Sequence, residues 1–173
     1  MKKRIVEIKN IDNNKKYKEI FSDEIKKIMD IPKMPKCEFF HIGSTSRENS
    51  IGELVVDILV VVDNLHEITT FDEKRLNNIL YHRVAHDKVK GVIKYARFID
   101  YYELSYDVLL YVVQRDTLVY NQFIEFEKLI NSDRNIAEQY NIFKAKYKGN
   151  NFIYNDYLIE KTRFIQGVLK RMK

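Results

Sequence analysis

The sequence predicts an α+β fold, with a mixed β-sheet flanked by helices and a C-terminal helical segment. Two observations predict it. The run Leu54–Val62 is almost purely apolar and β-branched, which is typical of a buried strand. Everything after Asp116 has helical periodicity instead. With two prolines and five glycines there is no room for a flexible linker. We therefore expect one domain over residues 1–173, with an α/β core over about 1–113 and packed helices over about 114–173.

The first half of the chain alternates between strand and helix patterns. Apolar residues recur every three or four positions in the first helix, and Pro32 and Pro35 end it. The expected elements are, in order, a short strand at Ile5–Ile8, a helix over Lys15–Met29, a strand over Cys37–His41, a turn with a short helix after Gly43, the strand over Leu54–Val62 and a helix over Glu67–Leu80.

The second half changes from strands to helices. Lys94–Tyr102 and Leu104–Val113 are rich in Tyr, Ile and Val with polar positions between them, which predicts two long strands. Three helices are expected over about 116–131, 133–148 and 154–172. Ser132 or Asp133 is expected to begin the second of them, and Gly149 and two asparagines separate the second from the third.

Composition excludes several classes of protein. A hydrophobic fraction of 45% excludes a disordered chain, and one cysteine excludes a disulfide framework or a cysteine-based metal site. The N-terminal Met1-Lys2-Lys3-Arg4 leads into a short segment broken by charges, which does not match a signal peptide. No run approaches the roughly 18 apolar residues of a membrane span. We expect a cytoplasmic protein.

Basic charge is concentrated near the C-terminus. Residues 142–173 contain eight Lys and Arg against Asp156 and Glu160, a net charge of +6, whereas the whole chain is +5. Such a section suits an anionic partner such as nucleotide phosphate or RNA. Charged outer faces on terminal helices are the alternative explanation.

One acid, Asp57, interrupts the apolar strand. A carboxylate there costs several kcal/mol unless a partner stabilises it, so a polar site, a cation or a metal is expected beside it. Upstream, Gly43 and Ser44 follow an extended segment. Glycine lets the backbone approach a ligand closely, and Ser44 or Thr45 is expected to cap a helix whose free N–H groups attract anions. The sequence therefore predicts a phosphate cradle beside a strand acid, as in a nucleotidyltransferase site.

The second carboxylate of such a site is missing from its usual place. Metal-assisted nucleotidyl transfer generally uses two acids at positions i and i+2 of one strand, and Leu59 stands two residues after Asp57. Asp63 lies about 20 Å further along an extended strand. A two-metal site therefore requires the fold to bring another acid to Asp57, the candidates being Glu53, Asp107, Asp100 and Glu103.

The run His41-Ile42-Gly43-Ser44-Thr45-Ser46, with Asp57 eleven residues further on, resembles the signature of the GrpB-like family. This is a poorly characterised bacterial group with a nucleotidyltransferase-type fold. Weaker similarities extend over most of the chain: Gly91 to Arg97-Phe98, Phe126 to Leu129, Tyr140 with Lys144, and Tyr157 with Lys161 and Phe164-Ile165.

Some positions depart from the family pattern. Where the family usually has Val-Pro-Gly-Leu, this chain has Arg47-Glu48-Asn49-Ser50, and Glu53 stands where the family has a lysine before a proline. The family's late strand commonly carries a His-x-His pair, which matches Leu109 and Tyr111 here. The residues most suggestive of metal or acid–base chemistry are thus partly replaced.

The resemblance implies a protein that binds a nucleotide or another phosphate-bearing ligand. Under the hypothesis that the protein is an enzyme, Asp57 and Asp107 are the expected catalytic residues. Asp57 is then also the expected ligand of a Mg²⁺ ion. The alternatives are a non-catalytic binding module on the same fold and an RNA-associated protein. His41, Arg97 and Lys161 each have a structural alternative, as a hydrogen-bonded histidine, an ion pair and a core lysine. The expected substrate-binding residues are His41, Gly43, Ser44, Thr45, Arg97, Lys144 and Lys161.

Overall fold

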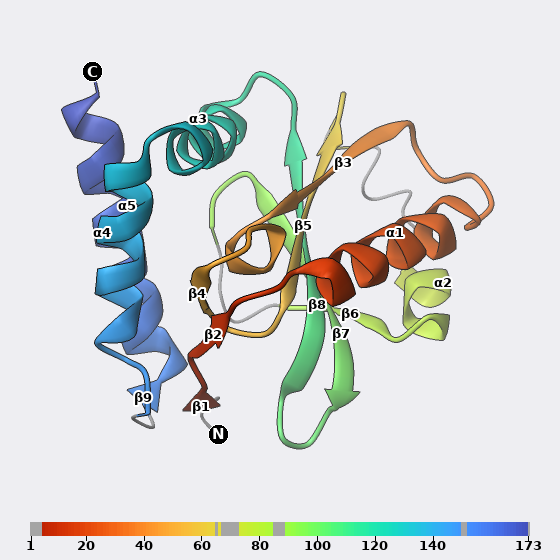
Figure 1. Ribbon diagram of the computed structural model, residues 1–173. Coiled ribbons are helices and arrows are strands. Elements are labelled where there is room, and N and C mark those ends of the chain that lie inside the picture. Colours follow the sequence, from red (N-terminus) through yellow and green to blue (C-terminus); the bar gives the residue numbers. More distant parts are fainter. Residues whose placement is uncertain (1–4, 65, 67–72, 85–88, 150–151, 173) are drawn as a thin grey trace.

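The computed structural model describes residues 5–64, 66, 73–84, 89–149 and 152–172 (Figure 1). Its elements are, in order, β1 (Ile5–Val6), β2 (Lys9–Ile11), α1 (Lys15–Met29), β3 (Cys37–Ile42), the 3₁₀ helix η1 (Ser44–Ser46), β4 (Ser50–Gly52), β5 (Val56–Val62), α2 (Glu73–Asn78), β6 (Tyr81–Arg83), β7 (Val92–Asp100), β8 (Ser105–Gln114), α3 (Leu118–Ser132), α4 (Arg134–Ala145), β9 (Phe152–Ile153) and α5 (Tyr154–Arg171).

The main sheet is mixed, as the sequence predicts. Its strand order is β3-β5-β8-β7-β6, and β5 runs parallel to β8 while the other neighbours are antiparallel. The apolar strand expected to be central is β5, an interior strand next to the middle strand β8. Its side chains pack against helices on both faces of the sheet, which explains its continuous apolar sequence.

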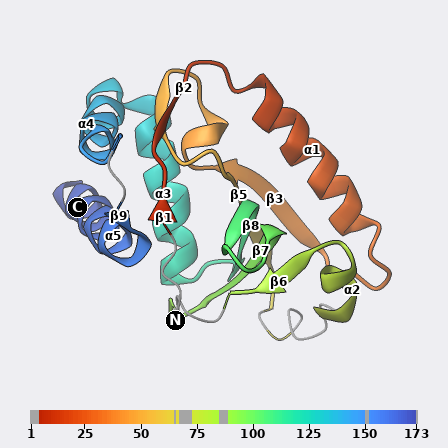
Figure 2. The ribbon, with the colours of Figure 1, turned by 90° about the horizontal axis from the view of Figure 1, so that it is seen from below.

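Helices cover both faces of this sheet. In two perpendicular views, α1 and α2 lie on one side and α3, α4 and α5 on the other (Figures 1 and 2). Alternate residues of β5 point to opposite sides. Ile58 and Val60 pack toward Ile28 of α1, whereas Leu59 packs toward Phe123 of α3. Asp57 shares the second face with Leu59, so its side chain points toward the C-terminal helices.

The three C-terminal helices pack as one unit, as predicted. Phe126 and Ile130 of α3, Tyr140 of α4 and Val168 of α5 form a common buried cluster. Asp133 is the N-cap of α4 and accepts hydrogen bonds from the backbone N–H groups of residues 135 and 136. Among the described residues, no helix has the length and apolar character needed to cross a membrane.

The short edge elements differ most from the predictions. Of the first strand expected over Ile5–Ile8 the structure contains β1, and β2 follows beyond the expected bounds; β1 and β2 pair with β9 and β4 in separate ribbons. β4, β6 and β9 were not predicted, because strands of two or three residues carry too little periodicity and form through pairing with distant segments. Of the helix predicted over Glu67–Leu80, the structure contains Glu73–Asn78, and residues 67–72 lie outside the described residues.

A buried carboxylate joins α1 to the sheet. Glu24 is 1% exposed, and it accepts hydrogen bonds from the Tyr81 hydroxyl at 2.8 Å and from Lys27 at 2.6 Å, and one from Arg97. Arg97 also forms a bidentate pair with Asp107. Removing one partner of a buried ion pair leaves the others desolvated and unpaired, which is strongly destabilising.

We therefore expect Glu24→Ala to lower the free energy of unfolding by about 3 kcal/mol, because it orphans the buried Tyr81 hydroxyl and one side of Arg97. Urea unfolding measures the change. Glu19→Ala is the matched control on the exposed face of the same helix, with an expected change within about 0.5 kcal/mol. Equal losses in both variants would contradict this role of Glu24.

Candidate functional site

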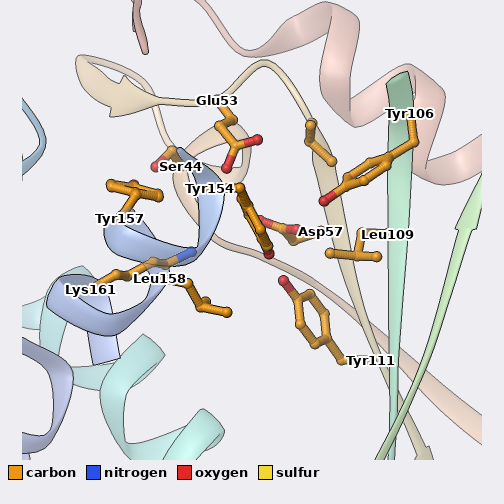
Figure 3. A pocket seen from close by; sticks show the side chains of 11 residues that line it. Ser44, Glu53, Asp57, Tyr106, Leu109, Tyr111, Tyr154, Tyr157, Leu158 and Lys161 are labelled. Carbon is orange, nitrogen blue, oxygen red and sulfur yellow. The ribbon is translucent and has the colours of Figure 1, made fainter. Parts of the chain in front are cut away.

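A small polar pocket lies where β5 begins, between the sheet and α5 (Figure 3). Its volume is about 20 Å³, the space of one water molecule. Of the residues predicted for the site, Ser44, Asp57 and Lys161 come together in this pocket, whereas Arg97 and Lys144 do not line it. The pocket is lined by Ser44, Glu53, Val55, Asp57, Tyr106, Leu109, Tyr111, Tyr154, Tyr157, Leu158 and Lys161.

The glycine turn packs directly on Asp57. Gly43 has φ 76°, a conformation that side chains disfavour, and a Cβ atom on it would lie 2.5 Å from Asp57 Oδ2. A glycine is therefore needed here for a close approach, as expected. The group that the backbone approaches is the Asp57 carboxylate rather than a ligand. The Gly43 N–H donates to Glu127 Oε1 at 3.0 Å. A carboxylate of α3 thus occupies the place expected for a phosphate.

Burial raises the pKa of the Glu127 carboxyl. The hydrogen bond from the Gly43 N–H group and the cations of Arg47 and Lys161 lower the same pKa, but by less. Glu127 therefore lies among basic groups while its own ionisation is disfavoured.

Ser44 and Thr45 are not helix caps, and this expectation was wrong. They lie within η1, a helix of three residues whose N-cap position is Gly43 and whose N-terminus has no side-chain cap. The Thr45 hydroxyl is buried and donates to the Val55 carbonyl at 2.9 Å. The Ser44 hydroxyl donates to the Ile51 carbonyl at 3.0 Å. Both side chains fasten the turn to the neighbouring backbone, and Ser44 also lines the pocket.

Lys144 of α4 lies behind Ser44. Its Nζ atom donates to Ser44 Oγ at 2.7 Å and lies 4.1 Å from the centre of the Tyr140 ring. The side chain is 0% exposed. Burial first, and then the cations of Arg47 and Lys161, lower the pKa of Lys144 to about 6. Near neutral pH this lysine is therefore largely uncharged, and it supports Ser44 from inside the protein.

Lys161 of α5 points into the pocket with Asp57 (Figure 3). Its pKa lies well above the ordinary value because Tyr140, then Tyr157 and Asp57, favour the ammonium form more than burial disfavours it. Lys161 is therefore protonated at physiological pH. It supplies the positive charge that the sequence predicts beside the carboxylate of β5.

A larger cavity of about 230 Å³ adjoins the pocket. Asp57, Tyr111, Leu158 and Lys161 line both spaces. The remaining walls come from β7, α3 and α5 and are mainly apolar. The described residues thus form a polar compartment and an apolar compartment that share the Asp57–Lys161 wall.

Three of the residues predicted for this site lie on the opposite face of the sheet. Arg97 and Asp107 pair with each other, and Arg97 also pairs with Glu24 of α1. A bulge in β8, where Arg97 is opposite Val108 and Phe98 opposite Tyr106, places Asp107 outside the regular alternation. Asp107 therefore cannot share a metal ion with Asp57. Arg97 is therefore part of a structural ion pair, which the sequence offered as the alternative to substrate binding.

His41 is the third of these residues. Its ring stacks on Phe21 of α1 at 4.9 Å between centroids, and its Nε2 atom lies 3.0 Å from Thr45 Oγ1. Burial and the charge of Lys18 lower the pKa of His41 to about 4. It is a neutral, packed histidine on the α1 side, as its structural alternative predicts.

Two acidic residues line the pocket, which is too few for a two-metal centre. Glu53 and Asp57 line the same pocket and both point into it (Figure 3). Leu59, at the i+2 position, is fully buried in the core. Within the described ranges, no group of three or more His, Cys, Asp and Glu residues could hold a metal ion. Mg²⁺ is commonly held by one or two carboxylates together with water and ligand phosphates.

Sequence reasoning missed several residues of these compartments. Glu127 was identified only as part of a helical similarity, and Lys94, which is 6% exposed and lines the larger cavity, was not singled out. Lys94 lies opposite Tyr111 in the β7–β8 ladder, on the inward face. A lysine at an inward position of a strand is the signal that could have identified it.

Lys144 leads to a prediction about stability and pH. The unfolded chain protonates this lysine up to its ordinary pKa of 10.5 and the folded protein only below about 6. Unfolding therefore takes up a proton within this window, so stability should rise with pH there, by up to about 1.4 kcal/mol per pH unit. We expect Lys144→Met to remove this rise in urea unfolding, and exposed Lys146→Met to retain it. The same pH dependence in both variants would contradict the assignment.

Comparison with known proteins supports the architecture. The chain is 24% identical to the glutamate-rich protein GrpB of Alkalihalophilus pseudofirmus over 166 residues, which cover 94% of each sequence. The crystal structure of the conserved protein GrpB from Enterococcus faecalis is similar with a TM-score of 0.69 and 18% identity, covering 95% of this chain and 98% of that one.

A structure of Cid1, named for RNA terminal uridylyl transferase activity, is similar with a TM-score of 0.50 and 11% identity, covering 76% of this chain and 39% of that one. At these identities, the two structural similarities show the fold alone. The fold is thus related to that of GrpB and of a nucleotidyltransferase. The family model described as GrpB protein matches residues 6–171, and the chain belongs to the GrpB family.

Proposed function

We propose that the protein binds a nucleotide, or another small phosphate-bearing ligand, beside Asp57, and that it does so without two-metal nucleotidyl transfer. The observation that carries the proposal is the shared wall of Asp57 and Lys161 between a polar pocket and a larger, mainly apolar cavity. Binding sites typically combine an apolar enclosure with a few convergent polar groups. The likeness of the fold to Cid1, a uridylyl transferase, supports a nucleotide as the ligand.

The cation of the proposed site is Lys161, because the buried Lys144 behind Ser44 is largely uncharged near neutral pH. Lys161 is protonated and lines both compartments, so it can approach a ligand phosphate directly. The Gly43 N–H is already bonded to Glu127. The proposed phosphate position is therefore on the Lys161 side of Asp57, rather than at the backbone of the glycine turn.

The proposal includes a single Mg²⁺ ion. Asp57 and Glu53 would hold it, together with water and phosphate oxygens. The ion would neutralise phosphate charge next to the two carboxylates. Without it, Glu53 and Asp57 would repel the anionic part of the ligand.

Two features argue against turnover. Nucleotidyl transfer through two metals uses additional carboxylates, and Leu59 and the distant Asp107 leave only Glu53 and Asp57 in the pocket. Leu109 and Tyr111, which match the family's His-x-His pair, also line the pocket and provide no imidazole there. A non-catalytic module is the function that this set of residues fits best.

The net charge of residues 142–173 overstates the support for RNA association. Of the eight basic residues after residue 141, Lys144 is fully buried and Lys161 lines the internal compartments. Part of the predicted basic surface is therefore inside the protein. Arg163, Lys170 and Arg171 are exposed on α5, and charged outer faces are ordinary on terminal helices.

Calorimetric titration with nucleoside triphosphates, with and without Mg²⁺, tests the proposal. We expect Mg²⁺ to strengthen binding, and Asp57→Asn to weaken the Mg²⁺-dependent binding by about tenfold, the loss of one charged contact. Asp107→Asn is the matched control, because it makes the same chemical change on the opposite face. Its effect on affinity should be negligible.

Two results would contradict the proposal. Absence of nucleotide binding in the wild type would exclude the ligand class. Release of pyrophosphate from a bound triphosphate, abolished by Asp57→Asn, would show a nucleotidyl transfer that the proposal denies.

A further inference from the structure

The apolar cavity beside Asp57 is open to the surface, where exposed residues of α3 and α5 line it. Its volume is about 230 Å³. An engineered cavity of roughly 150 Å³ holds benzene, whereas pockets for drug-sized ligands measure about 300–1,000 Å³. The space therefore fits one heteroaromatic ring system rather than a whole nucleotide.

The walls provide aromatic surfaces. Tyr111 of β8, Phe123 and Phe126 of α3 and Tyr140 of α4 all line the cavity. Flat aromatic side chains are the usual partners of planar rings, and base–aromatic stacking is sequence-tolerant. An alkyl chain would fill the same space without using these surfaces in any specific way.

Polar residues, some exposed and one buried, also line the cavity. Gln122 of α3 and Thr162 and Gln166 of α5 line it and are exposed, so the opening between these two helices is polar. At the inner side, Lys94 is 6% exposed and its Nζ atom lies 5.5 Å from the centre of the Tyr111 ring. An ammonium donates hydrogen bonds, and amides both donate and accept, which matches the edges of a nucleobase.

From this arrangement we propose that the cavity between β7, α3 and α5 is the binding site for the base of a nucleotide, with Lys94 donating to a base acceptor. The inference rests on the proposed function and names the ligand class for the same site. The base occupies the apolar compartment and the phosphates lie at the Asp57–Lys161 wall, because the polar pocket beside Glu53 has room for about one water molecule or one ion and not for a phosphate chain. Glu53 lines only the polar pocket, whereas Lys94 and Ile165 line only the cavity.

The experiment uses the four common ribonucleosides, which have no phosphate, and Mg²⁺-tripolyphosphate, which has no base. Saturation-transfer NMR detects binding and calorimetry measures Kd. Ile165→Trp fills the cavity, and Ile159→Trp is the matched control on the same helix, at a side chain that is 51% exposed. Lys94→Met keeps the volume but removes the ammonium. Glu53→Gln changes only the polar pocket, and thermal unfolding verifies that each variant is folded.

We expect at least one nucleoside to bind. Ile165→Trp and Lys94→Met should each weaken that binding by about tenfold or more, while Ile159→Trp leaves it within about twofold. Glu53→Gln should instead weaken Mg²⁺-tripolyphosphate. Should Ile165→Trp fail to fold, Lys94→Met gives the same readout.

The inference about the base is overturned if tripolyphosphate binds in a Glu53-dependent way and no nucleoside binds. That result would leave the proposed function standing. Nucleoside binding indifferent to both Ile165→Trp and Lys94→Met would also overturn it, as would octanoate binding to the cavity in the absence of nucleoside binding. If neither nucleosides, tripolyphosphate nor triphosphates bind, the proposed function fails as well.

Discussion

The contact between Gly43 and Asp57 is the constraint on which the site depends. Gly43 has a positive φ and no space for a Cβ, because Asp57 Oδ2 would lie 2.5 Å from it. This close approach places the η1 turn against the start of β5, where Ile42 and Asp57 are direct strand neighbours. The Gly43 N–H then reaches Glu127 of α3. One residue without a side chain thus joins an edge strand, an interior strand and the C-terminal helices.

Around this contact, buried charges are balanced from several elements. Lys161 comes from α5, Lys144 from α4 and Glu127 from α3, while Asp57 belongs to the sheet. Desolvation disfavours each ion separately. It lowers the pKa of Lys144 to about 6 and raises that of Glu127, whereas Lys161 remains charged beside Asp57. Lys161 is therefore the cation of the site that stays charged next to the carboxylates. This limits the chemistry that the site can support.

Much of the fold follows from periodicity, but the partners of individual side chains do not. The helix over Lys15–Met29 and the mixed sheet were predictable because long elements carry a strong pattern. The pocket beside Asp57 was predictable because an acid in an apolar strand needs polar neighbours. The face occupied by Asp107 was not predictable, since a one-residue bulge in β8 changes it. The hydrogen bond from the Gly43 N–H to Glu127 was not predictable either, because it joins residues 84 positions apart.

The central claim is that ligand phosphates and one divalent cation meet at Asp57. A crystal structure with a non-hydrolysable nucleoside triphosphate and Mn²⁺ in place of Mg²⁺ tests it most directly, because Mn²⁺ gives an anomalous signal. The account predicts a single anomalous peak within direct coordination distance of a carboxylate oxygen of Asp57. Phosphate oxygens should complete its coordination, with Lys161 in contact with the phosphates. A peak at Asp107, two peaks at Asp57, or a nucleotide bound away from the Asp57–Lys161 wall would contradict it.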